Sequence, residues 1–256
     1  MADVDVRVKD RIAVVTLNRP QQRNAMTLAM WQAVARIFND LGQNNDCRAI
    51  VLTGAGGNFS VGADVAEFGQ VRSNKTQSKA YEVAVDASSD AIAGVGKPVL
   101  AVLEGYCLGG GCHLAMACDF RYAHSNASIG IPAAKLSIVY GVRSTQRLLA
   151  LVGIGHAKRM LFSGQRYSAP NAPQGFIDDI SPDPMSSAMS FARELAQLAP
   201  LSISGAKTIL NGLSMGEGAL NLEAADALID FTSDSNDYEE GRKAFAEKRS
   251  PDFRGT

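Results

Sequence analysis

The sequence predicts an α/β protein whose last third is helical, and three observations support this. Short apolar runs typical of buried strands alternate with helical patterns over the first 140 residues. After about residue 143 only helical patterns follow. The hydrophobic fraction of 46% over 256 residues is enough for one large core with a smaller appendage. We therefore expect a layered core at residues 1–195 and a helical region at residues 196–256.

The elements of the core follow from local patterns. Residues 12–17 form the first expected strand, because they are apolar and rich in β-branched side chains. A helix is expected from Thr27, which can cap the first turn, because apolar residues recur there at intervals of three and four. The other expected elements before residue 143 are strands at residues 49–53, 99–103 and 120–123, and helices at residues 78–93 and 111–117.

The C-terminal third is predicted to be a series of helices. The turn-forming segment Ser181-Pro-Asp-Pro184 predicts a break between the core and this tail. A charged run at residues 237–249 has the pattern of a solvated helix, but it contains the aromatic Phe245. The other expected helices cover residues 144–151, 156–162, 186–198, 203–213 and 217–231.

Charge and cysteine content exclude several classes of partner. The chain has 25 Lys and Arg against 26 Asp and Glu, so nothing favours nucleic acid. The four cysteines show no paired Cys-x-x-Cys spacing, so we expect no metal and reduced, buried thiols. Charged residues and glycines interrupt the apolar stretch at residues 98–118, and no secretory signal is evident. We expect a soluble, cytoplasmic protein with no membrane partner.

Two glycine-rich turns each follow a predicted strand. They are Asn58-Phe-Ser-Val-Gly-Ala-Asp64 and Gly105-Tyr-Cys-Leu-Gly-Gly-Gly-Cys112. Dinucleotide binding is disfavoured, because the third glycine of its fingerprint would fall on Phe59, and no Gly-Lys-Ser/Thr follows. The second turn opens the helix predicted at residues 111–117, where unpaired N–H groups favour an anion or a developing oxyanion such as that of a thioester. The alternative is a turn that only allows close helix–strand packing.

Seven motifs stand in a fixed order between residues 18 and 249. They are Asn18-Arg-Pro…Arg23-Asn-Ala25, Phe59-Ser-Val-Gly-Ala-Asp64, Lys97-Pro-Val-Leu-Ala-Val-Leu-Glu-Gly105, Gly109-Gly-Gly-Cys112, Ala117-Cys-Asp119, Thr145-Gln-Arg147 and Phe245-Ala-Glu-Lys-Arg249. In these motifs the chain resembles the enoyl-CoA hydratase/isomerase (crotonase) superfamily. The resemblance implies a crotonase-like spiral of β-β-α units with a helical C-terminal trimerisation region. It also implies an acyl-CoA substrate and a homotrimer, or a hexamer made of two trimers.

The resemblance also implies roles for particular residues. The N–H groups of Ala63 and Gly110 would form an oxyanion hole. Phe245 and Lys248 match tail positions that touch the adenine end of CoA from a neighbouring subunit. No cofactor is implied beyond CoA as part of the substrate. The CoA path would be lined by Arg23, Ala25, Val61, Asp64 and Val65.

The chain departs from the hydratase pattern at two positions. Hydratases that the chain resembles use two glutamates to activate water, and this chain has His113 and Ala133 there. Alanine cannot exchange a proton, and general acid–base catalysis commonly supplies about 10²–10⁴-fold. His113 is the first candidate for the proton, because imidazole titrates near neutrality, although a helix N-terminus disfavours its cation.

Tyr140 is the second candidate, because acyl-CoA decarboxylases of the superfamily resemble this chain in carrying a tyrosine there. The alternative for Tyr140 is a wall that shapes the acyl pocket. Asp119 is expected to be a structural anchor paired with Arg121 or Arg147. Glu67 and Glu82 can project toward the pocket from helices, but their spacing does not decide this.

The leading interpretation is an acyl-CoA enzyme, a lyase or isomerase, that stabilises a thioester enolate in an oxyanion hole. Because the second glutamate position holds Ala133, two-carboxylate hydration is not expected. The alternatives are an acyl-CoA decarboxylase, a thioester hydrolase, and an acyl-CoA-binding protein without turnover.

Overall fold

The computed structural model describes residues 2–216 and 218–256. Its body is built on a six-stranded sheet with the strand order β1-β2-β3-β4-β6-β9. The first pair is antiparallel, and the following pairs are parallel. A second sheet has the order β5-β7-β8. The bounds are β1 (Val4–Lys9), β2 (Ile12–Leu17), β3 (Ala49–Gly54), β4 (Val99–Leu103), β5 (Tyr106–Leu108), β6 (Phe120–Ala123), β7 (Ser128–Gly130), β8 (Arg166–Ser168) and β9 (Asp179–Ile180).

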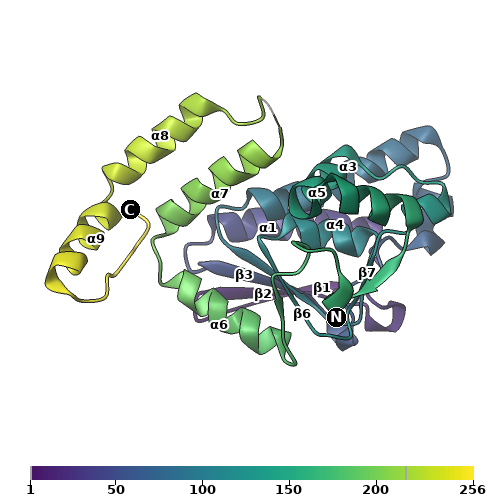
Figure 1. The fold of residues 1–256 in the computed structure, drawn as a ribbon, viewed down its shortest axis with the longest axis horizontal. Coiled ribbons are helices and arrows are strands. Elements are labelled where there is room, and N and C mark those ends of the chain that lie inside the picture. Colours follow the sequence, from purple (N-terminus) through teal and green to yellow (C-terminus); the bar gives the residue numbers. More distant parts are fainter. Residues whose placement is uncertain (1, 217) are drawn as a thin grey trace.

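Helices cover both faces of the large sheet (Figure 1). Val51 and Leu100 pack with α6 on one face, whereas Ile50 and Leu52 belong to the larger core on the other face. Because both faces are covered, the central strands are continuous apolar runs without polar alternation. The larger core is covered by α1 (Leu28–Gln43), α3 (Lys75–Gly94), α4 (Gly110–Ala117) and α5 (Val142–Ser163), and the other face by α6 (Pro184–Ala196).

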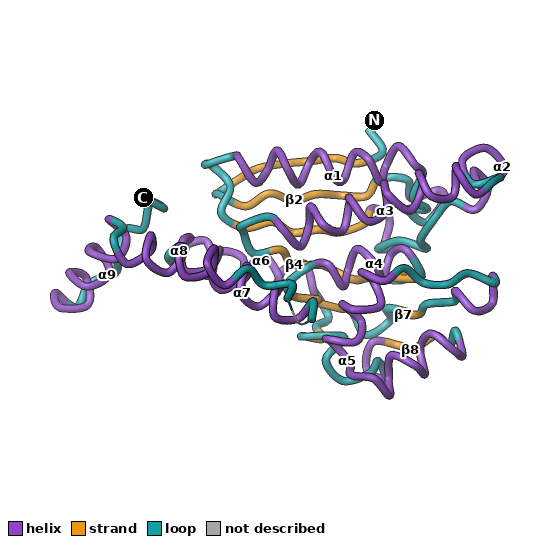
Figure 2. Tube along the Cα trace, turned by 90° about the horizontal axis from the view of Figure 1, so that it is seen from above, coloured by secondary structure: helices purple, strands orange, loops and turns teal. Residues whose placement is uncertain are grey.

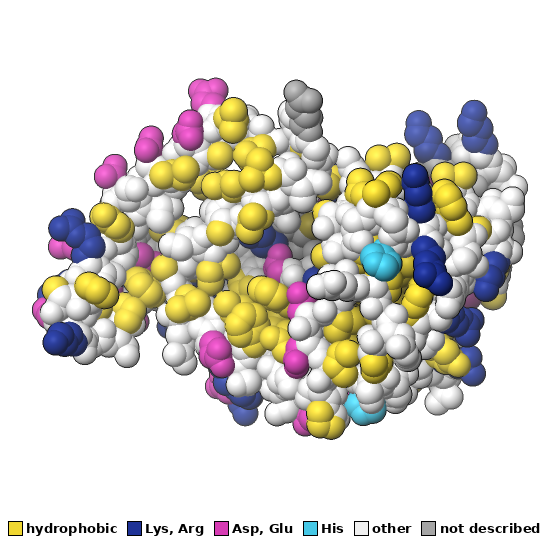
Figure 3. Space-filling model, viewed as in Figure 1, with side chains coloured by type: hydrophobic (Ala, Val, Ile, Leu, Met, Phe, Trp, Pro, Cys, Tyr) yellow, Lys and Arg dark blue, Asp and Glu magenta, His cyan; other side chains and the backbone are white. Residues whose placement is uncertain are grey.

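The last three helices extend away from this body (Figures 1 and 2). They are α7 (Pro200–Ser214), α8 (Leu222–Ser233) and α9 (Asn236–Glu247). Hydrophobic side chains remain uncovered over this region (Figure 3), among them Leu210, Leu213, Leu222, Ile229 and Phe231. A monomer rarely exposes so continuous an apolar surface without a partner for it.

Lys207 anchors α7 to the body. Its buried ammonium group lies 2.7 Å from the Asp119 carboxylate and donates to the Lys97 carbonyl at 2.9 Å. Asp119 is therefore a structural anchor as expected, but the expected partners were wrong. Arg121 pairs with Asp178, and Arg147 pairs with Asp90. The cation that Asp119 uses comes from a helix 88 residues further along the chain.

Most predicted elements of the core are confirmed. Residues 12–17, 99–103 and 120–123 are strands with the predicted bounds. Thr27 caps α1, because its side chain accepts a hydrogen bond from the Met30 N–H at 3.2 Å. The edge strand β1 was missed, although its valines alternate with charged residues as in a strand. The strands β5, β7, β8 and β9 were also missed, and each has only two or three residues.

The helical tail differs from its prediction at three points. The segments 144–151 and 156–162 lie in one element, α5, which is interrupted at Gly153 by a left-handed φ of 70°. The segment before Pro184 is not the break between body and tail, because α6 follows it and packs on the sheet. The helix predicted from Glu217 starts only at Leu222, capped by Asn221, while Glu217 itself lies outside the described residues. No helix in the described ranges combines the length and apolar character of a membrane span.

Candidate active site

The first glycine-rich turn leaves one N–H group free. Met26 donates to the Gly62 carbonyl at 2.8 Å and accepts from the Asp64 N–H at 2.9 Å. These two bonds form an isolated parallel β-bridge between Met26 and Ala63, so the Ala63 N–H points away from Met26. Among the described residues, it has no hydrogen-bond acceptor.

The second turn leaves another N–H group free at the start of α4. Gly109 has a φ of 50°, which favours glycine, and its N–H donates to the Gly130 carbonyl at 2.8 Å. Gly110 is the first residue of α4, so its N–H has no partner within the helix. Within the described part of the chain, no other acceptor reaches it.

The two turns touch each other, and the absence of side chains makes this possible. A Cβ atom built on Gly110 would lie 3.3 Å from the amide nitrogen of Ala63. A Cβ built on Gly62 would lie 2.8 Å from the Gly110 nitrogen and 2.7 Å from the Leu108 carbonyl oxygen. Gly62 also has a φ of 92°, so both space and backbone conformation require glycine. The amides of Ala63 and Gly110 are therefore neighbours, as the motifs imply.

Ala63 and Gly110 both line a cavity of about 140 Å³. Trp31 forms part of its wall, and the edge of its indole lies 2.9 Å from a Cβ built on Gly110. Most of the lining is apolar, and helices α1, α3, α4 and the start of α5 contribute to it. The ionisable side chains that line it in the described structure are Arg72, Tyr81, Glu82, His113 and Tyr140.

His113 lies at the floor of this cavity and is 1% exposed. Its Nε2 is 3.3 Å from the Val85 carbonyl, which can only accept, so Nε2 carries the proton. Its Nδ1 therefore accepts from the Ser144 hydroxyl. Burial, with a smaller contribution from Arg147, lowers the pKa of His113 to about 4. The imidazole is neutral at pH 7 with both nitrogens occupied, which favours a positioning role over that of a base.

Tyr140 is fixed above the second glycine turn. Its hydroxyl donates to the Gly109 carbonyl at 3.1 Å, and its ring meets the His113 ring edge-on at 6.5 Å between centroids. Burial raises the pKa of Tyr140 well above 10. The phenol therefore keeps its proton at neutral pH and holds the backbone that carries the Gly110 N–H.

Of three positions that could bring a carboxylate to the cavity, one holds an alanine and two hold glutamates. Ala133 lines the cavity and brings no acidic group to it. Glu67 accepts a hydrogen bond from the Leu28 N–H at 2.9 Å, so it is occupied at the start of α1. Glu82 lines the cavity and pairs with Arg72 at 2.5 Å. The structure thus resolves what sequence spacing left open, because it directs one of the two glutamates to the site.

The loops predicted to line the CoA path are tied together beside the cavity. The Arg19 guanidinium contacts the Asp64 carboxylate at 2.9 Å and donates to the Ala25 carbonyl at 2.7 Å. The Val61 N–H donates to the Arg23 carbonyl at 3.1 Å. Arg19 belongs to the first motif, and its link between the two loops depends on tertiary packing that sequence spacing does not indicate.

The other predicted CoA contacts are more exposed or more distant. Val65 is 57% exposed, and the Arg23 guanidinium stacks over the Tyr106 ring at 5.2 Å. Phe245 lies near the end of α9 and is 87% exposed. Lys248 is the C-cap of the same helix and has a left-handed backbone conformation. Phe245 and Lys248 are not part of the cavity lining of their own chain.

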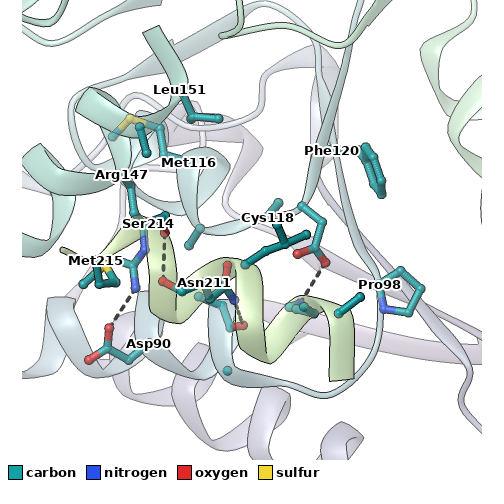
Figure 4. A pocket seen from close by; sticks show the side chains of 18 of the residues that line it. Asp90, Pro98, Met116, Cys118, Phe120, Arg147, Leu151, Asn211, Ser214 and Met215 are labelled. Carbon is teal, nitrogen blue, oxygen red and sulfur yellow. Dashed lines mark hydrogen bonds and ion pairs between the residues drawn. The ribbon is translucent and has the colours of Figure 1, made fainter. Parts of the chain in front are cut away.

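A second cavity of about 880 Å³ lies between α7 and the body (Figure 4). Its polar groups are already paired, as in the Arg147–Asp90 contact at 2.8 Å and the Lys207–Asp119 contact. The remaining lining is largely apolar, including Met116, Leu151 and Met215. This cavity lies where the tail joins the body and contains neither of the free amides.

The layered α/β body and the cavity between two glycine turns agree with the crotonase-like class that the motifs indicate. The family model for enoyl-CoA hydratase/isomerase matches residues 7–256. The chain therefore belongs to the enoyl-CoA hydratase/isomerase family. It is an enzyme of that family, and the family acts on acyl-CoA substrates.

Relatives from bacteria match over nearly the full length. The chain is 30% identical to the 2,3-dehydroadipyl-CoA hydratase of Escherichia coli (strain K12), with 100% of both chains covered. It is 31% identical to the short-chain-enoyl-CoA hydratase of Clostridium acetobutylicum, over 96% of this chain and 95% of that protein. The crystal structure of an enoyl-CoA hydratase from Bacillus anthracis superimposes with a TM-score of 0.88 at 30% identity, and 100% of both chains is covered.

Proposed function

We propose that the enzyme stabilises the enolate of an acyl-CoA thioester, with the Ala63 and Gly110 N–H groups as its oxyanion hole. The supporting observation is that these two free donors lie side by side on one cavity wall. Gly110 also begins α4, so the helix dipole adds to the attraction for negative charge. Loss of one such donor typically costs about 3–4 kcal/mol of transition-state stabilisation.

Water addition by two carboxylates is disfavoured by the lining. Ala133 has no acidic group, and His113 is neutral and hydrogen-bonded on both sides. A reaction that only needs an enolate and one proton carrier fits the site better, which favours isomerisation of the acyl double bond. Decarboxylation is the second candidate, because Ala133 stands at the second glutamate position, Tyr140 lies in the same cavity lining, and loss of CO2 forms the enolate without a strong base.

The CoA portion is proposed to follow the loops joined by Arg19. In this arrangement Val61 and Val65, which line the cavity, present apolar surface, and the buried Ala25 holds the loop through its carbonyl. Asp64 serves to hold the loops, because its carboxylate is already paired with Arg19. Arg23 is exposed and provides a positive charge for the CoA phosphates.

Assembly into trimers, singly or as hexamers, is proposed from the tail. The uncovered apolar surface of α7 and α8 needs a partner, and a neighbouring subunit of the same chain supplies one. The exposed Phe245 and the adjacent Lys248 would then meet the adenine end of CoA bound to the neighbour. The division at residue 195, the spiral winding of the body and the cytoplasmic location stay predictions.

Mass spectrometry of CoA thioesters in deuterated water tests this function. The panel contains trans-2-enoyl, 3-enoyl, methylmalonyl and saturated acyl thioesters, each compared with a reaction without protein. Interconversion of the enoyl isomers with deuterium uptake is the expected result. Loss of CO2 would support the second candidate. Release of free CoA, or gain of water as the main product, would contradict the proposal.

A further inference from the structure

Of the ionisable side chains that line the cavity, Glu82 is the candidate for a catalytic base. Resting on the function proposed above, we propose that Glu82 is the catalytic base that removes and returns the acyl proton beside the thioester. It is the carboxylate in the cavity lining of the described structure, and it lies outside the seven sequence motifs. Its side chain is 44% exposed, so substrate and solvent can reach it.

The position of Glu82 is fixed relative to the free amides by two contacts of α3. The neighbouring Tyr81 accepts a hydrogen bond from the Trp31 Nε1 at 2.8 Å, and the far edge of the same indole lies against Gly110. One turn later, the Val85 carbonyl accepts from His113 of α4. Glu82 and Val85 are three residues apart and share one face of the helix. That face is therefore held against the N-terminal part of α4, where the oxyanion hole is proposed.

The other ionisable groups of the lining are committed elsewhere. The Tyr140 hydroxyl donates a hydrogen bond to the Gly109 carbonyl, and the pKa of Tyr81 is raised to about 12 by burial. His113 uses both ring nitrogens, and its pKa is lowered to about 4. The Arg72 guanidinium stays cationic in proteins. Glu82 is left as the carboxylate of the lining that can take up a proton from substrate.

Arg72 holds Glu82 in place and favours its ionised form. The guanidinium stacks over the Phe68 ring at 5.0 Å and the Tyr81 ring at 5.3 Å, which limits its movement. Burial raises the pKa of Glu82 and Asp86 adds to this, while Arg72 lowers it. The charged or ionisable groups around Glu82 are thus Arg72, Asp86, Tyr81 and Tyr140. A raised carboxylate pKa strengthens a base, provided that the group remains ionised at working pH.

The chemical step balances without a further reactant. The C–H bond next to the thioester carbonyl breaks, and its proton goes to a Glu82 carboxylate oxygen. The electron pair of that bond forms the carbon–carbon double bond of the enolate, while the carbonyl π pair moves to oxygen. That oxygen is held by the Ala63 and Gly110 N–H groups. The neutral Glu82 then returns the proton to the same α-carbon. In the conjugated enolate of a 3-enoyl thioester it can instead protonate the γ-carbon, which moves the double bond next to the carbonyl.

Deuterium exchange into a saturated acyl-CoA in D2O isolates this step. Glu82→Gln keeps the size and hydrogen-bonding capacity of the side chain but removes the base. We expect exchange to fall by about 10²–10⁴-fold, with unchanged affinity for the thioester in calorimetry. Asp86→Asn is the matched control, because Asp86 lies one turn further on the same helix, also has a raised pKa, and does not line the cavity. It should keep most of the exchange, and its rise with pH should move to lower pH, because Asp86 contributes to the raised pKa of Glu82.

Two further readouts separate a base from a structural residue. The wild-type exchange rate should rise with pH as Glu82 ionises, through a pKa above the usual 4.5, and this rise should be absent from the Glu82→Gln profile. Formate should restore part of the exchange in Glu82→Ala, since it can occupy the vacated position as a base. Exchange by Glu82→Gln at the wild-type rate would overturn the role of Glu82 alone. Absence of exchange in the wild type across the panel would overturn the proposed function as well.

Discussion

The small cavity has two walls that differ in what they are made of. One is a backbone wall, defined by the amides of Ala63 and Gly110, and it offers donors that do not titrate. The other is a side-chain wall, defined by Tyr81, Glu82, His113 and Tyr140, and it holds the ionisable groups. The backbone wall depends on glycine conformations that tolerate no side chain. The side-chain wall depends on hydrogen bonds that fix Tyr81, His113 and Tyr140, and on the ion pair by which Arg72 holds the Glu82 carboxylate.

The largest effect is expected from breaking the backbone wall at Gly62. Gly62→Ala places a Cβ 2.7 Å from the Leu108 carbonyl oxygen and 2.8 Å from the Gly110 nitrogen, at a φ of 92°. Strain and overpacking together should cost about 3 kcal/mol of unfolding free energy. Urea unfolding measures this loss. Gly57→Ala is the matched control, because its φ is also positive at 71° while nothing lies within 4 Å of its Cβ. Equal losses in the two variants would show that contact between the turns does not matter.

A smaller effect is expected from acidifying the side-chain wall. The folded pKa of His113 is lowered to about 4, below the unfolded value of 6.5, so the unfolded state binds the extra proton first. This contribution to stability is present above pH 6.5 and is lost as the pH falls toward 4. Between pH 7 and pH 5 the loss attributable to His113 is about 2 kcal/mol. Urea unfolding of the wild type and His113→Gln at both pH values measures it, because the variant lacks this titration. The same pH dependence in both proteins would contradict the buried, neutral imidazole.

The smallest effect is expected where the two walls touch. Tyr140→Phe removes the hydrogen bond to the Gly109 carbonyl and leaves the ring against His113. The expected loss of stability is about 1 kcal/mol. Deuterium exchange should fall by less than tenfold, because the hydroxyl positions the turn and carries no proton to substrate. A loss of exchange as large as that of Glu82→Gln would instead make Tyr140 the proton carrier.

The backbone wall could be predicted from sequence much better than the side-chain wall. Gly62 and the Gly109–Gly111 run follow strands whose apolar pattern is clear, and their conformational requirements are local. Glu82 lies within a long helix where many polar residues face solvent, so its direction depends on how α3 packs against α1 and α4. The sequence therefore identified the strands β2, β3, β4 and β6 and the two glycine turns, but it left the choice between Glu67 and Glu82 open.

Long-range ion pairs could not be predicted from the sequence either. Asp119 was expected to pair with a nearby arginine, yet it pairs with Lys207 of α7. Charge complementarity alone cannot select among several basic residues, since the selection is made by tertiary packing. The edge strand β1 is a different case, because Val4, Val6 and Val8 alternate with charged residues in the pattern typical of a strand, and this run was not among the expected strands.

The central claim is that the backbone wall stabilises an enolate, and a pair of substitutions at Gly110 tests it most directly. Gly110→Pro removes the N–H donor at the first position of α4, where proline fits a helix, whereas Gly110→Ala keeps the donor. Both add a Cβ beside Trp31. Proline also places its Cγ and Cδ on the nitrogen side, so binding of the acyl-CoA is measured for both variants. The measurement is deuterium exchange into a bound acyl-CoA. We predict that the proline variant exchanges about 10²–10³-fold more slowly than the alanine variant. Equal rates at equal binding would contradict the oxyanion hole.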